Sequence, residues 1–183
     1  MAEISSPTDY FTRTIPQQYA TAMSSAPASA ADHPELTAIY EITGEGGGTF
    51  GLRAGGGQIE VVPTSQIAKP DLRTMMSYDD WRVFAESDAT DLFVDYLRRG
   101  KVSVVKGLKG TVRLELTRSN DDLWQSATTF GGHADPAVTL QMTNDDYQAM
   151  MSGDLNSQMA FLTGKLKFEG SLPLLMQIGA LTS

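Results

Sequence analysis

The first candidate for chemistry in this chain is a glycine-rich run. Gly46-Gly47-Gly48-Thr49-Phe50-Gly51 has the spacing G-x-G-x-x-G and follows a strand-like segment. In a dinucleotide site that spacing opens a helix, whose N-terminus binds the pyrophosphate. Here Leu52-Arg53-Ala54-Gly55 continues as a strand and a turn, and no P-loop lysine pair follows. The run therefore predicts a hairpin turn rather than a nucleotide site.

Two histidines are the candidate bases and metal ligands. His133 lies in a Gly-rich loop with Asp135 nearby, and His33 stands beside Pro34. The commoner zinc sites need three protein ligands, and a base needs a group that positions it. The chain has no cysteine, which removes thiolate zinc sites, iron–sulfur clusters, thiol nucleophiles and disulfides. We predict a polar turn before a strand at His133 and a linker position for His33, with no cofactor and no metal.

Two pairs of acids resemble the paired carboxylates of hydrolytic sites. Asp79-Asp80 follows Ser77, and Asp145-Asp146 follows Thr143. In each case a hydroxyl residue stands three positions before an acid, which is the spacing of a helix N-cap. The pairs therefore predict helix starts, and no serine lies in a nucleophile elbow. With no catalytic constellation evident, the sequence predicts that the protein is not an enzyme.

The size and charge of the chain narrow its class further. Its 183 residues include 22 acidic and 14 basic ones, for a formal charge of −8. The length favours one compact body, and the acid excess argues against a general nucleic-acid binder. The most apolar run, residues 172–181, is shorter than the ~20 residues that cross a bilayer. The start lacks a secretory signal, so a cytoplasmic location is predicted.

The first third of the chain predicts a helix followed by an antiparallel meander. Thr8 is a candidate cap for the helix, and Pro16 predicts a kink within it. Residues 24–31, rich in Ser, Ala and Pro, form a predicted linker. Strand patterns follow around residues 36–42, 50–52 and 59–62, joined by glycine turns at 44–48 and 55–57.

The second half of the sequence partly repeats the first. Residues 70–107 and 136–170 each predict a strand, a capped helix, a short helix and a strand that starts at a Gly-Lys pair. The first copy's second strand is predicted at Gly100-Lys101-Val102-Ser103-Val104. After Gly110 the alternation predicts a further strand, whereas the run after Gly170 predicts a helix with Pro173 in its first turn. We interpret the repetition as a partial internal duplication.

The second copy resembles the sterol carrier protein type two family, in its sterol-binding domain. The resemblance rests on five features in order: Asp145-Asp146-Tyr147, Ser152-Gly153-Asp154-Leu155, Ala160-Phe161, Gly164-Lys165-Leu166-Lys167 and the apolar run 174–181. It implies a sheet covered by helices, with an apolar tunnel that holds sterols, fatty acids, fatty acyl-CoA or phospholipids.

From this resemblance we predict an α+β fold with a sterol-carrier-like sheet covered by helices. Three parts are predicted: an N-terminal helix and linker (1–35), a sterol-carrier-like first unit (36–118) and a repeated second unit (119–183). The partly duplicated unit has the order strand–helix–helix–strand. The units are predicted to pack as one compact body.

Apolar residues of the second unit are the predicted ligand-binding wall. They are Met150, Met151, Met159, Phe161, Leu166, Phe168, Leu174, Leu175 and Ile178. Methionine is unbranched and polarizable, so it suits a wall that adapts to ligands of varied shape, and it also fills ordinary cores. The first-unit equivalents are predicted to be core: Trp81, Phe84, Phe93 and Tyr96.

Half of the basic residues fall between positions 98 and 118. They are Arg98, Arg99, Lys101, Lys106, Lys109, Arg113 and Arg118. Such a stretch suits transient contact with an anionic membrane surface or an acidic head group, and equally suits a solvated face of two strands.

The predicted function is binding, and possible transfer, of a lipid or other elongated apolar ligand in an internal hydrophobic cavity. The partner is then a lipid or fatty acyl molecule, not a nucleic acid. Two alternatives stay open. One is a biosynthetic enzyme or accessory protein that holds a hydrophobic intermediate. The other is an interaction or oligomerisation module whose cavities are filled, which would expose an apolar patch or a sheet edge.

Overall fold

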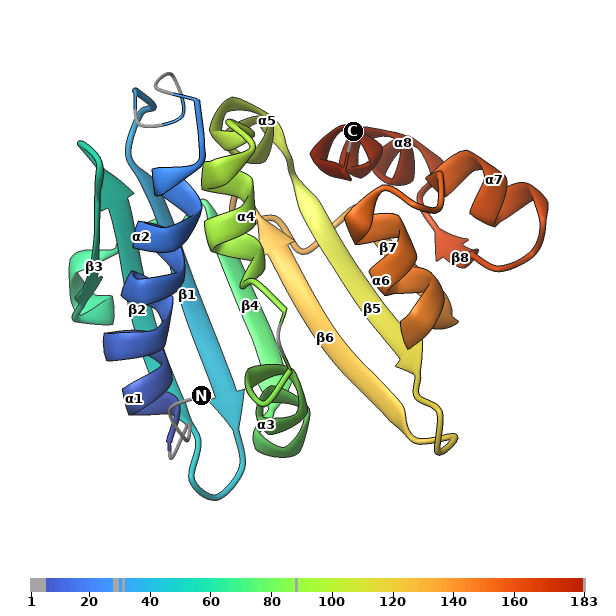
Figure 1. Cartoon of the computed structure of the whole chain (residues 1–183), viewed down its shortest axis with the longest axis horizontal. Coiled ribbons are helices and arrows are strands. Elements are labelled where there is room, and N and C mark those ends of the chain that lie inside the picture. The colour runs from blue at the N-terminus through green and yellow to red at the C-terminus, as the bar shows by residue number, and fades with distance from the viewer. Residues whose placement is uncertain (1–5, 28–29, 31, 88, 183) are drawn as a thin grey trace.

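The centre of the protein is one mixed sheet of eight strands (Figure 1). This computed structural model describes residues 6–27, 30, 32–87 and 89–182. The strands are β1 (Leu36–Thr43), β2 (Gly48–Gly55), β3 (Gln58–Val62), β4 (Leu72–Ser77), β5 (Gly110–Thr117), β6 (Leu123–Phe130), β7 (Ala137–Thr143) and β8 (Lys167–Gly170). Their order across the sheet is β3-β2-β1-β4-β6-β5-β7-β8. The pairs β1–β4 and β5–β7 are parallel, and all other neighbours are antiparallel.

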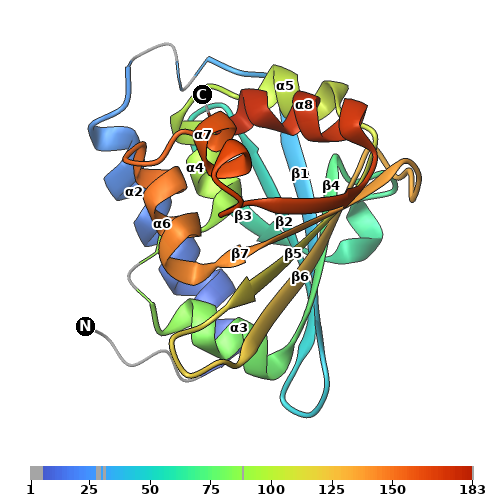
Figure 2. The same cartoon turned by 90° about the vertical axis from the view of Figure 1, so that its right-hand side faces the viewer.

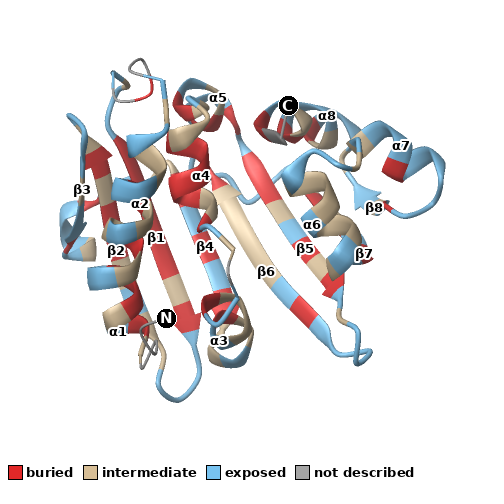
Figure 3. Ribbon diagram, in the orientation of Figure 1, coloured by how far each residue is buried: buried red, intermediate tan, exposed pale blue. Residues whose placement is uncertain are grey.

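The helices gather on one face of this sheet, which confirms the α+β prediction (Figure 2). They are α1 (Pro7–Asp9), α2 (Ile15–Ser24), α3 (Tyr78–Ala85), α4 (Leu92–Arg98), α5 (Val102–Gly107), α6 (Asn144–Ser152), α7 (Ser157–Leu162) and α8 (Leu172–Thr182). Strand β4 alternates buried and less buried residues (Figure 3), and β7 does the same, as expected when only one face is covered. Of the helices in the described residues, none is long and apolar enough to span a membrane.

The N-terminal helix starts earlier than predicted. Ser6, not Thr8, is the cap, and its Oγ accepts a hydrogen bond from the amide of Asp9 at 3.1 Å. Pro7 occupies the first helical position, where the missing N–H costs nothing. Pro16 falls in the first turn of α2, directly after a π-helical turn over residues 10–14. The chain thus accommodates Pro16 by a change of helix type. Positions 28, 29 and 31 of the predicted linker lie outside the described residues.

The glycine turns and the helix caps agree with the sequence. Residues 46–51 lie in the β1–β2 hairpin, so the G-x-G-x-x-G run opens no helix. The hydroxyl of Ser77 accepts from the amide of Asp80 at 3.0 Å, at the start of α3. The hydroxyl of Thr143 accepts from the amide of Asp146 at 3.1 Å, at the start of α6. Both acid pairs therefore lie in the first turn of a capped helix, as predicted.

The strand predicted at residues 100–104 is wrong, because this segment enters helix α5. Val102 and Val105 are buried and stand three residues apart, which fits a helix. The reason for the difference lies in the sheet. A strand in this position would need the outer edge of β4, and β6 already pairs with that edge. In the second copy no described strand from the other half of the chain occupies the equivalent edge of β7, so β8 pairs with it.

A buried carboxylate joins the N-terminal helix, the sheet and α4. Asp91 caps α4 and accepts hydrogen bonds from the amide of Phe93 at 2.9 Å and the hydroxyl of Tyr10 at 3.2 Å. The hydroxyl of Tyr40, on β1, donates to the same carboxylate at 2.5 Å. Burial raises the pKa of Asp91, while the three hydrogen bonds oppose that rise. These contacts fix α4, which contributes to the site described next.

Candidate functional site

A pocket of about 630 Å³ lies between the second half of the sheet and helices α4, α6, α7 and α8. Small-molecule sites have volumes of roughly 300–1,000 Å³. The floor comes from alternate residues of β5, β6 and β7, which point to the covered face because side chains alternate along a strand. They are Val112, Leu114, Thr128, Phe130, Leu140 and Met142. Among the described residues that line the pocket, none carries a charge.

Seven of the nine predicted ligand-binding residues line this pocket. They are Met150, Met151, Phe161, Leu166, Phe168, Leu175 and Ile178. The other two lie elsewhere. Met159 is 52% exposed on α7, and Leu174 is 1% exposed and packs over Gly110 in the core. The structure thus brings most of the predicted residues together, and their role in binding stays a prediction.

Sequence reasoning missed the floor of the pocket and its contribution from the first unit. Leu92 and Tyr96, one turn apart on α4, reach into it. Tyr96 was predicted to be core and is 8% exposed; Trp81 and Phe93 are core residues, at 2% and 0%. Phe84 is partly buried against the core. The alternation along β5 predicted which residues share a face, but nothing local shows that helices stand off from that face and leave space.

The pocket opens where α7 and α8 meet solvent. Phe161, Leu162, Leu172 and Met176 line the pocket and are also exposed, with exposed fractions of 48–71%. Together with Met159, they make up five of the eight exposed large hydrophobic residues among those described. We call these five residues the apolar rim. A bound molecule could enter through it without crossing a charged group on either helix.

Two of the polar side chains that line the pocket, Thr128 and Asn156, have hydrogen-bond partners. The hydroxyl of Thr128 pairs with that of Thr74 at 2.9 Å. The side chain of Asn156 caps α7, accepting from the amide of Gln158 at 2.8 Å. The hydroxyls of Tyr96 and Tyr147 differ, since no hydrogen-bond partner for them occurs in the described part of the chain. Burial is the main cause that raises the pKa of each phenol, so both hydroxyls stay protonated at neutral pH.

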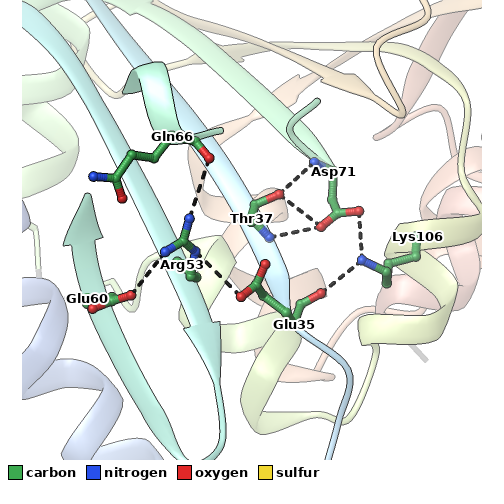
Figure 4. Close-up of polar contacts among 7 residues, drawn as sticks. All are labelled: Glu35, Thr37, Arg53, Glu60, Gln66, Asp71 and Lys106. Carbon is green, nitrogen blue, oxygen red and sulfur yellow. Dashed lines mark hydrogen bonds and ion pairs between the residues drawn. The ribbon is translucent and has the colours of Figure 1, made fainter. Parts of the chain in front are cut away.

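The basic stretch 98–118 is largely engaged within the protein. Figure 4 shows Lys106, whose Nζ lies 2.9 Å from Oδ1 of Asp71 and donates to the carbonyl of Glu35 at 2.8 Å. Arg98 and Arg99 both pair with the buried Asp95. These contacts hold α4 and α5 in place. Contact of this stretch with an anionic membrane stays a prediction.

Polar contacts around Asp71 and Arg53 also link neighbouring strands of the first half of the sheet. Oδ2 of Asp71 accepts from the amide of Thr37 at 2.9 Å, which links β1 to the start of β4. Arg53 on β2 pairs with Glu60 at 3.4 Å and Glu35 at 3.5 Å (Figure 4). The charged groups of this cluster pair with one another, while Nε of Arg53 is buried without a hydrogen bond in the described residues.

The remaining candidates for chemistry are dispersed. His133 is exposed in the turn after β6, and its amide donates to the carbonyl of Phe130 at 3.2 Å. His33 is far from it in sequence and partly buried. Within the residues that the structure describes, no group of three or more His, Cys, Asp or Glu could hold a metal ion.

Comparison with known families identifies the segment that forms the pocket. Residues 96–183 match the model described as the SCP-2 sterol transfer family. These residues, just under half of the chain, are similar to that family. The match confirms the resemblance inferred from the sequence and supports binding or transfer of a lipid or sterol. Every residue that lines the pocket, except Leu92, lies within the SCP-2 segment.

Curated relatives share the SCP-2 segment within much longer proteins. "Peroxisomal multifunctional enzyme A" of Dictyostelium discoideum is 31% identical over 87 residues, which is 43% of this chain and 20% of the relative. "Hydroxysteroid dehydrogenase-like protein 2" of Homo sapiens is 33% identical over 83 residues, 41% of this chain and 20% of the relative. The matched part is thus about a fifth of these relatives. Their enzyme names correct the prediction that the protein is not an enzyme.

Two solved structures overlap part of the fold. Sterol carrier protein 2 from Yarrowia lipolytica, in its apo form, is 22% identical and covers 39% of this chain and 65% of its own, with a TM-score of 0.33. Sterol carrier protein domain 2 of Helicoverpa armigera is 23% identical and covers 48% of this chain and 78% of its own, with a TM-score of 0.39.

Proposed function

We propose that the protein binds an elongated apolar ligand, such as a lipid, in the pocket of the SCP-2 segment and transfers it. The observation that carries this proposal is a pocket of about 630 Å³ whose described lining has no charged residue. Its lining is made of aliphatic, aromatic and methionine side chains, with few polar groups. The description of the matched family, sterol transfer, supports the same function.

The expected affinity suits reversible carriage. Burying a sixteen-carbon chain gains ~0.8 kcal/mol per methylene, or roughly 13 kcal/mol in total. Association costs ~4–15 kcal/mol in lost motion and ordering. The net free energy is therefore at most about 9 kcal/mol, which corresponds to a dissociation constant in the sub-micromolar range or weaker. The apolar rim supports transfer, because it places the entrance among residues that can contact a membrane or another lipid carrier.

A pair of methionine variants tests the proposal. Met151→Trp places an indole in the pocket, whereas Met75→Trp places one on the uncovered face of β4, where Met75 is 46% exposed. We expect Met151→Trp to reduce binding of a fluorescent fatty acyl probe at least tenfold, and Met75→Trp to leave it unchanged. Equal binding by both variants, with both folded by circular dichroism, would contradict the proposed site.

The names of the relatives favour a second role for the same pocket. Proteins that contain the SCP-2 segment are named as enzymes, so a bound hydrophobic molecule could be held for a reaction. The test is to incubate the protein with acyl-CoA and sterol substrates and analyse the products by mass spectrometry. Conversion of a bound molecule would favour this role. Recovery of every bound molecule unchanged would favour carriage, and absence of any bound molecule would favour the filled-cavity alternative.

We also propose that the fold arose by partial duplication. The strand order β2-β1-β4 recurs as β6-β5-β7, and corresponding pairs have the same directions. In this arrangement β5 corresponds to β1, so we place the start of the second copy at Gly110. The predicted division into 36–118 and 119–183 stays a prediction. A chain that starts just before β5 would test the proposed start by its ability to fold.

A further inference from the structure

We infer that the hydroxyls of Tyr96 and Tyr147 bind a neutral oxygen atom at one end of the apolar ligand. The ligand class is a lipid with a hydroxyl, ketone or ester oxygen, taken in preference to an ionised fatty acid. The inference rests on the proposed function, because it assigns the polar contact within the same pocket. Nothing in the family match or in the names of the relatives assigns these two residues.

The two tyrosines reach the pocket from different parts of the chain. Tyr96 lies on α4, in the first unit, and Tyr147 lies on α6, one turn after its cap. Both line the pocket. Figure 1 shows α4 and α6 on the same face of the sheet, on either side of β5 and β6.

Both hydroxyls have an unmet hydrogen-bonding capacity. Two other buried tyrosines, Tyr10 and Tyr40, donate to Asp91. The hydroxyl of Tyr19 is unpaired but fully enclosed, so no ligand could reach it. Tyr96 and Tyr147 have no partner in the described residues and are not among the fully enclosed unpaired groups. Tyr96 is 8% exposed and Tyr147 is partly buried, so both hydroxyls are open to the pocket, where an oxygen atom of a ligand would supply the missing partner.

The charges around the pocket select a neutral oxygen rather than a carboxylate. Protonated phenols can donate to an acceptor, and burial keeps both phenols protonated. The described lining offers no cation to an ionised group. The charged groups that raise the pKa of the two tyrosines, Asp91 and Asp95, are both acidic. Arg98 and Arg99 are committed to Asp95, so a carboxylate buried here would be unpaired.

Two conservative variants test the assignment. Tyr96→Phe and Tyr147→Phe remove only a hydroxyl, and Tyr78→Phe, on α3 and outside the pocket, is the matched control. The ligands are 1-hexadecanol, hexadecane and palmitate at pH 8, measured by displacement of a fluorescent apolar probe. We expect each pocket variant to weaken 1-hexadecanol binding about fivefold, the typical effect of one net hydrogen bond. Hexadecane binding should not change, and Tyr78→Phe should match the wild type.

The wild-type protein provides a second measurement that needs no variant. It should bind 1-hexadecanol at least tenfold more tightly than palmitate, and more tightly than hexadecane. Equal loss of alcohol and alkane binding in the Phe variants, or no loss of either, would overturn the assignment while leaving lipid binding intact. Failure of the wild type to bind the probe or any of the three ligands would instead overturn the proposed function itself.

Discussion

Replacement of Asp91 tests how α4 is held over the sheet, and therefore how Leu92 and Tyr96 reach the pocket. The carboxylate of Asp91 accepts from the hydroxyls of Tyr10 and Tyr40 and from the amide of Phe93. Asp91→Ala removes all three acceptor contacts at once. Asp91→Asn has nearly the same shape and keeps one carbonyl oxygen, so it is the matched comparison.

The size of the effect follows from burial. Asp91 is 2% exposed, so water cannot replace its carboxylate as the acceptor of these hydrogen bonds. A buried donor without a partner costs about 1–3 kcal/mol. Removal of a buried charge offsets part of this loss. We expect Asp91→Ala to lower the free energy of unfolding by about 3 kcal/mol and Asp91→Asn by about 1–2 kcal/mol. Urea unfolding measures both, from a shift in midpoint at constant m value.

The pH dependence of the stability difference between the wild type and Asp91→Asn can refute this argument. Burial raises the pKa of Asp91 above the ordinary aspartate value of 3.8. Between pH 3.8 and that raised pKa, the folded state holds a proton that the unfolded state has lost. The wild type therefore loses stability as the pH rises through this window, and Asp91→Asn lacks that loss. The difference between them should shrink from pH 4 upward. A difference that is constant or grows with pH would refute the argument.

Two further predictions concern the backbone and the rim. Gly110 has φ +124° and an added Cβ would lie 2.2 Å from the carbonyl oxygen of Pro136, so Gly110→Ala should destabilise by more than about 2 kcal/mol. Gly107→Ala, with open space around it, should stay within about 0.5 kcal/mol, and equal midpoints in urea would contradict the account. Met176→Ser, at the 71% exposed rim, should slow lipid transfer between vesicles several-fold, whereas Leu123→Ser should not; equal transfer rates would exclude the rim as the entrance.

The local features of the fold could be predicted because each has a local cause. The alternation of apolar residues predicted β1, β4, β5 and β7, and the pairs Ser77–Asp80 and Thr143–Asp146 predicted two helix starts. The first cap was misplaced because Ser6 and Thr8 are both plausible caps, and only Ser6 directly precedes a proline at the first helical position.

The features that depend on the whole sheet could not be predicted from the sequence. Residues 100–104 could extend the sheet only if the outer edge of β4 were free. That edge pairs with β6, a strand from the other half of the chain. The same holds for the pocket. Its helical wall was predicted from apolar residues near one another in sequence, but the part of its floor on β5 and β6, and Tyr96 on α4, come from more distant segments.

The most direct test of lipid binding is native mass spectrometry of the purified protein, followed by organic extraction and identification of what is released. We expect one neutral lipid per chain, lost in Met151→Trp and retained in Met75→Trp. A wild-type protein whose mass is that of the chain alone, and stays so after incubation with cholesterol, 1-hexadecanol, palmitate and palmitoyl-CoA, would contradict the proposed function.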